Sequence, residues 1–417
     1  MDGEDGRNGT ESLIAVAGLA VVRALHAHRA SLRRREHDGV GLSEQERRRY
    51  AEALKAAIGQ HAGGEPAEAL RGYGALLQLS PNDPVALTNA AQIWIDHGVS
   101  LQDAARALDL ATAATTDPGK RACVGIQRAR LHLCFGRYSE AVAELSSSVT
   151  VLPDPGADPA PTAWYLLGTC LMEMGDEPGA QRAFRTVLAH RPLAVEAWIA
   201  LARLVAESDR PAACKLLEHG QDFIAPPERA GPGAPPEEPG REQDGRPGGL
   251  AARQAGAGLL VEAALIMLEP PRDHEQARAF LDRAARLCPE SPYPLVNHAG
   301  IDEELRDLAA FRRHMGEAVP KVRHTDRRLI AHMLNEAFTG EYGDITLAAM
   351  GECGLIDRAE LRRRLEAWEH QRSTRERSTT VHHYYNGVVA GHGALVSGVR
   401  PAYSLNGGTA MTGDDIS

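Results

Sequence analysis

Apolar residues along most of the chain recur three and four positions apart, the spacing that puts them on one face of an α-helix. The segment from Pro161 to Pro192 has this pattern twice. Its first half carries the stripe Trp164, Leu167 and Leu171. After Gly175-Asp176, its second half carries Ala180, Phe184 and Val187. The pattern predicts two helices joined by a tight turn, with their apolar faces together.

Two small residues and a proline complete this segment. Gly168 and Ala180 allow the two helices to approach closely, and Pro192 ends the second helix. The same arrangement recurs with other residues before and after this segment. Terminal prolines lie at Pro81, Pro118, Pro153 and Pro192, in steps of 37, 35 and 39 residues. An internal repeat of this length predicts stacked helix pairs.

These positions resemble the signature of the tetratricopeptide repeat, whose period is about 34 residues. The resemblance covers residues 50–224 and 256–320. It implies an all-α fold, an α-solenoid of about six to seven helix pairs, in which each pair buries its apolar side only against its neighbours. Proteins of this family act as scaffolds or adaptors, so the resemblance implies a protein-binding function.

Changes in composition divide the chain into six predicted parts. A Pro- and Gly-rich stretch cannot form a core, and the last segment is rich in Val, Tyr and Gly, which favours short strands or disorder over a helix. The predicted parts are an N-terminal tail and helix (1–42), repeats (43–224), a linker or loop (225–250), further repeats (251–320), capping helices (321–372) and a β-prone or disordered tail (373–417).

Charge and cysteine usage indicate a soluble protein of a reducing compartment. The net charge of −10 gives no general attraction to nucleic acid or anionic lipid. The apolar run 13–22 is too short to span a bilayer and follows acidic residues, so neither a membrane span nor a signal peptide is predicted. The six cysteines include no Cys-x-x-Cys pair. We therefore expect a cytoplasmic location and no membrane partner.

Lysine is nearly absent, although arginine is abundant. Lysine occurs only at Lys55, Lys120, Lys215 and Lys321. This bias indicates a GC-rich bacterial genome of the actinobacterial kind and carries no functional meaning.

The family resemblance also implies a binding groove. In such repeats, positions 2, 5, 9, 12 and 13 of each first helix face the concave surface, and position 6 often carries an amide. Amide, guanidinium and carboxylate groups on such a surface can bind the backbone and side chains of a peptide. The groove residues implied here are Asn89, Gln92, Asp96, Arg130, Tyr165, Thr169, Glu173, Arg203, Glu207 and Asn297.

The same comparison argues against one known use of such a groove. Relatives that grip C-terminal carboxylates carry lysine and asparagine where this chain has Leu54 and Ile58. A clamp for the tail of a chaperone is therefore not expected.

No catalytic, cofactor or metal site is predicted from the sequence. His392-Gly393 resembles the histidine turn of caspase-like hydrolases, but a nucleophilic cysteine does not follow it. His382-His383 lacks a third ligand. Phosphate-binding and dinucleotide-binding motifs are absent from the sequence. We expect a protein that is not an enzyme and that binds no cofactor.

Two alternatives stay open for the partner. Residues 386–399 resemble Gly-punctuated, amyloid-type motifs of bacterial signalling and defence proteins, so the chain could recruit an effector, or associate with itself, through residues 380–400. The basic stretches 33–35 and 47–49 could instead make the N-terminal helix of a regulatory sensor contact nucleic acid. These stretches lack interleaved aromatic residues, and we do not expect a nucleic-acid partner.

Overall fold

The structure is a computed structural model, and it describes only part of the chain. The described residues are 14, 17–19, 21–22, 44–152, 154–225 and 249–375. The greater part of the predicted N-terminal region, of the linker (225–250) and of the C-terminal tail lies outside the described residues. The proposals that rest on residues 380–400, and most of the predicted N-terminal helix, therefore stay predictions.

The described residues are helical and contain no strand. They divide into two compact units, which we treat separately: unit 1 holds the described residues up to Arg191, and unit 2 begins at Pro192. Unit 1 contains α2 (Glu44–Ala62), α3 (Pro66–Leu79), α4 (Pro84–His97), α5 (Leu101–Ala114), α6 (Pro118–Cys134), α7 (Tyr138–Val151), α8 (Ala160–Glu173) and α9 (Glu177–His190).

Unit 2 continues the same architecture. It contains α10 (Val195–Ala206), α11 (Arg210–Ile224), α12 (Gly249–Leu268), α13 (His274–Leu287), α14 (Tyr293–Glu304), α15 (Leu308–Ala318), the 3₁₀ turn η1 (Val319–Lys321), α16 (Arg327–Thr339), α17 (Gly343–Glu352) and α18 (Arg358–Arg375).

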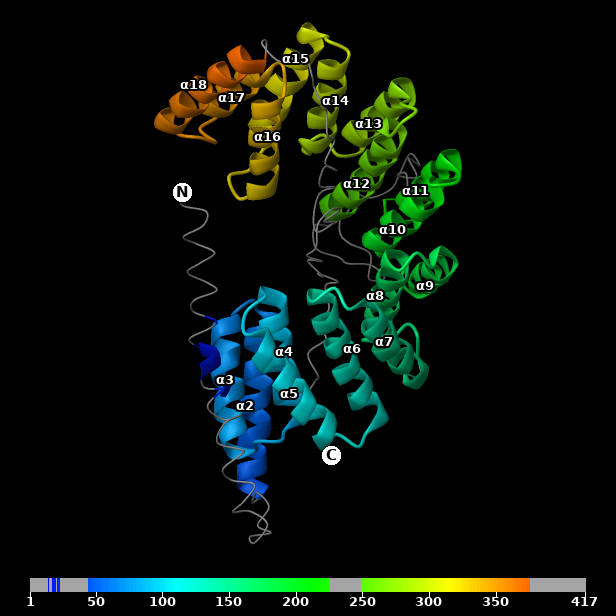
Figure 1. The fold of residues 1–417 in the computed structure, drawn as a ribbon, viewed down its shortest axis with the longest axis vertical. Coiled ribbons are helices and arrows are strands. Elements are labelled where there is room, and N and C mark those ends of the chain that lie inside the picture. Colours follow the sequence, from blue (N-terminus) through cyan, green and yellow to red (C-terminus); the bar gives the residue numbers. More distant parts are fainter. Residues whose placement is uncertain are drawn as a thin grey trace, which may run out of the picture. The chain divides into compact units, whose positions relative to one another are not determined.

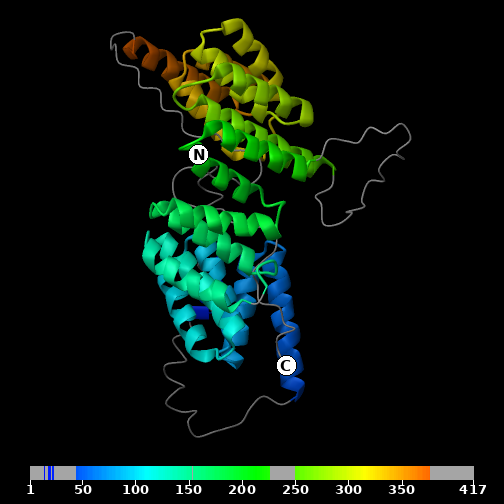
Figure 2. The ribbon, with the colours of Figure 1, turned by 90° about the vertical axis from the view of Figure 1, so that its right-hand side faces the viewer.

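Helices pack as consecutive pairs in both units (Figures 1 and 2). Each even-numbered helix from α2 to α16 contacts the odd-numbered helix that follows it, and each pair up to α14–α15 contacts the next pair in its unit. The first helices also contact one another, α2 with α4, α4 with α6 and α6 with α8 in unit 1, and α10 with α12 and α12 with α14 in unit 2. The predicted all-α stack of helix pairs is confirmed, and in the described part α16–α17 forms a further pair.

Aspartate side chains start many of the helices. The Asp176 carboxylate accepts a hydrogen bond from the Gly179 amide at the start of α9, with an O–N distance of 3.0 Å. Such a cap satisfies one of the backbone donors that a helix N-terminus leaves unpaired. The same bond, from an aspartate to the amide three residues later, starts α4, α6, α11, α13, α15 and α16.

The turn inside several pairs needs a left-handed backbone conformation. Glycine supplies it at Gly98, Gly136 and Gly175, where φ lies between 65° and 78°. Glycine has no Cβ to clash in this conformation, so it adopts it at low cost. The turn between α14 and α15 uses Arg306 instead, with φ of 59°. The chain thus reverses direction sharply, and the two helices of a pair lie against each other.

The core of unit 1 is close-packed around α4. Every residue from Val85 to Ile95 is buried, although an amphipathic helix would expose one face. Part of the N-terminal region contributes to this core, since Ile14, Ala17 and Val21 are 0–4% exposed. Their i, i+3, i+7 spacing is that of one helix face. The described part of the N-terminal helix is therefore packed into unit 1.

One helix of unit 2 is long and apolar enough to cross a membrane. This helix is α12, with 20 residues, and 61% of its most apolar window is buried within the protein. It packs between α11 and α13 and contacts α10 and α14. A core helix of a soluble protein has the same length and composition, and the packing of α12 agrees with that role.

Close helix approach predicts how unit 1 responds to a single added methyl group. A Cβ on Gly168 would lie 2.7 Å from Cε1 of Phe184, a ring that is fully buried. Gly168→Ala should therefore lower the free energy of unfolding by about 1–3 kcal/mol, because the core has to shift. Gly59→Ala is the matched control, since a Cβ there meets nothing within 4 Å. Removing a glycine from that exposed helical position should stabilise unit 1 by about 0.5–1 kcal/mol. Thermal and urea unfolding test both variants, and equal effects at the two positions would contradict the packing.

Candidate functional site

The predicted groove residues of unit 1 lie on the first helices, but several are buried. On α4, Asn89 is 0% exposed and Gln92 is 6% exposed, so neither faces solvent. The nearby Tyr73 hydroxyl is buried too, and burial raises the pKa of Tyr73. The Asn89 amide lies beside the Tyr73 hydroxyl, and this contact partly offsets that rise by lowering the pKa of Tyr73. The two predicted groove side chains, Asn89 and Gln92, are therefore buried within unit 1.

Asp96 and Arg130 form an ion pair, in which Arg130 is buried and Asp96 is exposed. The Arg130 guanidinium forms an ion pair with Asp96 and donates a hydrogen bond of 3.0 Å to Gln127. Asp96 belongs to α4 and Arg130 to α6, so the pair joins neighbouring first helices. The pair gives the buried Arg130 guanidinium a counter-charge and ties α4 to α6.

The predicted residues of α8 are mixed in their exposure. The Tyr165 ring lies 5.6 Å from the Phe184 ring, and the Thr169 hydroxyl donates a hydrogen bond to the Tyr165 carbonyl oxygen. Both side chains are half-buried, whereas Glu173 at the end of the helix is exposed. Only Glu173 offers its charged group fully to solvent here.

In unit 2, Arg203 again joins two first helices. Its Nε atom lies 2.5 Å from Oε1 of Glu262, so α10 is tied to α12. The Glu262 side chain is 1% exposed, and a buried carboxylate needs such a partner. Glu207 is exposed at the end of α10. Asn297 is buried on α14, and its amide donates a hydrogen bond of 2.8 Å to the Tyr293 carbonyl oxygen.

The arginine–glutamate pair between α10 and α12 leads to a stability prediction. Arg203→Met leaves the Glu262 carboxylate buried without its cation, and unit 2 should lose about 3–5 kcal/mol of unfolding free energy. The double variant Arg203→Met with Glu262→Gln should recover most of that loss, because no buried charge remains. Chemical denaturation followed by circular dichroism measures both variants. An Arg203→Met protein as stable as the native one would show that the pair does not hold the two helices together.

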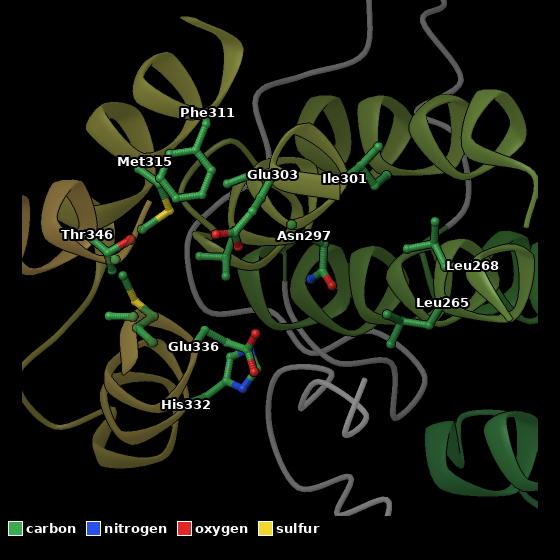
Figure 3. A pocket seen from close by; sticks show the side chains of 16 residues that line it. Leu265, Leu268, Asn297, Ile301, Glu303, Phe311, Met315, His332, Glu336 and Thr346 are labelled. Atoms are coloured by element: carbon green, nitrogen blue, oxygen red, sulfur yellow. The ribbon is translucent and has the colours of Figure 1, made fainter. Parts of the chain in front are cut away.

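An open hollow lies beside Asn297 in unit 2, and it is the site that we single out (Figure 3). Its volume is about 800 Å³, including the part open to solvent. The first helices α12, α14 and α16 supply most of the 16 lining residues, and α15 and α17 complete it. The apolar lining residues include Leu265, Leu268, Ile301, Phe311, Met315 and Met333.

Polar side chains in the hollow are few and come from three helices. Asn297 and Glu303 lie on α14, His332 and Glu336 on α16, and Thr346 on α17. Figure 3 shows Glu303, His332 and Glu336 in the same hollow, with Leu265 and Leu268 on one side and Phe311 and Met315 on the other. Mostly apolar walls with a few placed polar groups are the usual composition of a binding site.

The charge of Glu303 influences the ionisation of Glu336. Burial raises the pKa of Glu336, and the negative charge of Glu303 raises it further. Burial lowers the pKa of His332, which favours the neutral imidazole at pH 7. The ionised side chains in the hollow are therefore acidic.

Contacts with the turn between α16 and α17 set the position of Glu303. Its Oε1 atom accepts a hydrogen bond of 3.0 Å from the Tyr342 amide. A Cβ on Gly340 would collide with the same carboxylate, so the turn fits closely around it. The Tyr342 ring also packs against Phe311, with ring centres 5.2 Å apart. The wall of the hollow is thus held by backbone and aromatic contacts.

The sequence identified one residue of this site and could have identified three more. In the register that places Asn297 at position 6 of its repeat, Val296, Gly300 and Glu303 occupy positions 5, 9 and 12, and all three line the hollow. Those are groove positions of the family. His332 and Glu336 were missed because residues 321–372 were interpreted as capping helices without a repeat register.

Among the described residues, no group of three or more His, Cys, Asp or Glu side chains could hold a metal ion. The lining of the hollow provides apolar surface and negative charge. Those properties suit the binding of a side chain or short segment of another molecule.

Comparisons with known proteins agree with the repeat architecture. The tetratricopeptide repeat family matches residues 162–194, the segment with the clearest helix-pair pattern. The chain contains a tetratricopeptide repeat. No curated protein sequence matches it.

Solved structures with similar helix arrangements include several tetratricopeptide repeat proteins. One from Parabacteroides merdae is 13% identical and covers 77% of this chain and 98% of its own, with a TM-score of 0.42. PilF of Pseudomonas aeruginosa is 16% identical and covers 61% of this chain and 99% of its own, with a TM-score of 0.41. YrrB, described as having an unusual peptide-binding site, is 15% identical and covers 54% of this chain and 96% of its own, with a TM-score of 0.35.

Because the pKa of Glu336 is raised, the difference in stability between Glu336→Gln and the native protein should depend on pH. Because the carboxyl binds its proton more tightly in the folded than in the unfolded protein, its ionisation destabilises the fold at pH 7–8. That penalty disappears below the ordinary glutamate pKa of about 4.3, where both states are protonated. Glu336→Gln should therefore unfold at a higher temperature than the native protein near pH 8.

The advantage of Glu336→Gln should shrink as the pH approaches 4, and scanning calorimetry at both pH values measures it. Glu207→Gln removes the same charge from an exposed position of unit 2 and serves as the control. An advantage that is constant with pH, or absent near pH 8, would contradict the burial of a charged Glu336.

Proposed function

We propose that this protein is a scaffold or adaptor that binds a segment of a partner protein in the hollow of unit 2. The observation that carries the proposal is an open, mainly apolar hollow on the first helices α12, α14 and α16. A stack of helix pairs presents extended surface to other proteins, and concave apolar surfaces with a few polar groups bind peptides and helices.

Two further observations support this location over the rest of the predicted groove. In unit 1, Asn89 and Gln92 are buried, and Asp96 is paired with Arg130. In unit 2, Leu265, Leu268 and Val296 are half-buried at the hollow, so a bound partner could remove further apolar surface from water. Burial of apolar surface is the main favourable contribution to such binding, at about 25 cal/mol per Å².

The proposal locates the protein-binding groove in unit 2 and leaves the identity of the partner to experiment. The predicted cytoplasmic location agrees with this function.

A single substitution can fill the hollow without disturbing the fold. Gly300 lines the hollow in the middle of α14, and a Cβ there would meet nothing within 4 Å. Gly300→Trp should therefore leave the fold intact while occupying the space that a partner segment needs. We expect partners that co-purify with the native protein from the host cell to be reduced at least about tenfold, which corresponds to a loss of about 1.4 kcal/mol of binding free energy.

Gly316→Trp is the matched control. Gly316 is also a helical glycine of unit 2 with nothing within 4 Å of a Cβ, but it is exposed on α15 outside the hollow. Quantitative mass spectrometry of the captured proteins compares native protein, Gly300→Trp and Gly316→Trp. Partners that are retained equally by all three would place binding elsewhere on the chain.

A further inference from the structure

The charges that line the hollow of unit 2 are of one sign. Glu303 and Glu336 are its carboxylates, and neither Lys nor Arg is among the 16 described residues that line it. His332, the other titratable lining residue, has a pKa lowered by burial and is neutral at pH 7. Any segment that enters the hollow therefore meets apolar walls and a negative potential.

The carboxylates belong to different helices. Glu303 is on α14 and Glu336 on α16, and Figure 3 shows both side chains directed into the hollow. The Tyr342 amide holds one oxygen of Glu303 from the turn before α17. Glu303 is thus positioned by backbone contacts, and its charge lies on the wall before any partner arrives.

Keeping two acidic side chains near each other in a half-buried hollow is unfavourable. The charge of Glu303 raises the pKa of Glu336, which is the expected effect of like charges at close range. A cation placed between them would be attracted to both carboxylates and would relieve that repulsion. Charge-assisted hydrogen bonds from a guanidinium or ammonium group are about twice as strong as neutral ones.

We propose that the hollow receives an amphipathic segment of a partner protein in which one arginine or lysine, flanked by apolar side chains, reaches Glu303 and Glu336. This inference rests on the proposed function and specifies the chemistry of the partner. The apolar side chains of that segment contact Leu265, Leu268, Phe311 and Met315, and its cation lies at the acidic side of the hollow.

The walls also disfavour other occupants. An acidic segment would place a third negative charge in the hollow, which costs free energy at low dielectric. A purely apolar segment would gain burial but would desolvate the carboxylates without compensating them. The charge pattern therefore provides selectivity in addition to affinity.

A displayed library of amphipathic helical peptides tests this inference on the full-length protein. The library has fixed leucines at i, i+3 and i+7 and random residues at the positions between them. The library is first exposed to immobilised Gly300→Trp protein, which removes peptides that bind outside the hollow. The remaining peptides are then selected on the native protein. We expect Arg or Lys at one position of the selected peptides to rise at least about threefold above its frequency in the starting library.

Selected peptides are then measured by fluorescence anisotropy against Glu303→Gln/Glu336→Gln. Loss of the two carboxylates should weaken binding about tenfold, which corresponds to about 1.4 kcal/mol. Glu275→Gln/Glu317→Gln removes the same charge from exposed positions of unit 2 outside the hollow and should leave the dissociation constant within about twofold. Replacing the selected cation by norleucine in the peptide should weaken binding to the native protein and not to the Glu303→Gln/Glu336→Gln protein.

The following outcomes would contradict the inference. Selected peptides without an enriched cation, or with equal affinity for native protein and the Glu303→Gln/Glu336→Gln variant, would overturn the inference while leaving a peptide-binding hollow. Enrichment of acidic residues would also overturn it. Failure to select any peptide that distinguishes native protein from Gly300→Trp would overturn the proposed function together with the inference.

Discussion

Close contact between the two helices of each pair is the constraint on which the rest of the structure depends. Gly168 lies against the buried ring of Phe184 in unit 1, and Gly220 lies against Trp198 and Leu259 in unit 2. At these points any side chain larger than hydrogen would separate the helices. Because the helices touch so closely, large apolar rings of one helix are covered by the backbone of the other. Within each unit, a pair buries its remaining apolar side on the next pair, so neighbouring pairs stabilise one another.

Polar residues of the first helices are largely used to hold this stack together. Arg130 pairs with Asp96 across α6 and α4, and Arg203 pairs with Glu262 across α10 and α12. Both arginines follow the same Ala-Arg-Leu order in the sequence, at residues 129–131 and 202–204. A charge buried inside a protein must be paired, and these pairs meet that requirement without an outside partner. The guanidinium groups of Arg130 and Arg203 are therefore already paired within their own units.

The hollow of unit 2 differs because its ionised side chains are of one sign. Glu303 and Glu336 face the same space, and the apolar walls around them raise the pKa of Glu336. Such an arrangement does not serve stability, since a neutral side chain would suit those walls better. Proteins keep destabilising groups mainly where binding or catalysis requires them. Two acidic side chains in one mainly apolar hollow are therefore a feature that folding alone does not favour.

The fold was predictable from the sequence, whereas the site was predictable only in part. Periodicity, the turn glycines and the regular prolines determine the helix pairs, because these signals act within about forty residues of chain. Asn297, and by the same register Gly300 and Glu303, could be assigned to the inner face of α14. Their exposure could not be assigned, and Asn89 shows the difference: it has the same register position as Asn297 but lies fully buried in unit 1.

By itself, the sequence determined which segments are helices, how they pair, and which side of each helix is apolar, since all of this follows from local spacing and from the residues that cap and turn the chain. Only the tertiary structure decided which polar side chains bind each other and which face an open hollow. The meeting of Glu303, His332 and Glu336 is such a case. The helix α16 carries no readable repeat register, and its position is set by the packing of Leu329 and Met333 in one apolar cluster with Phe311 and Met315 of α15.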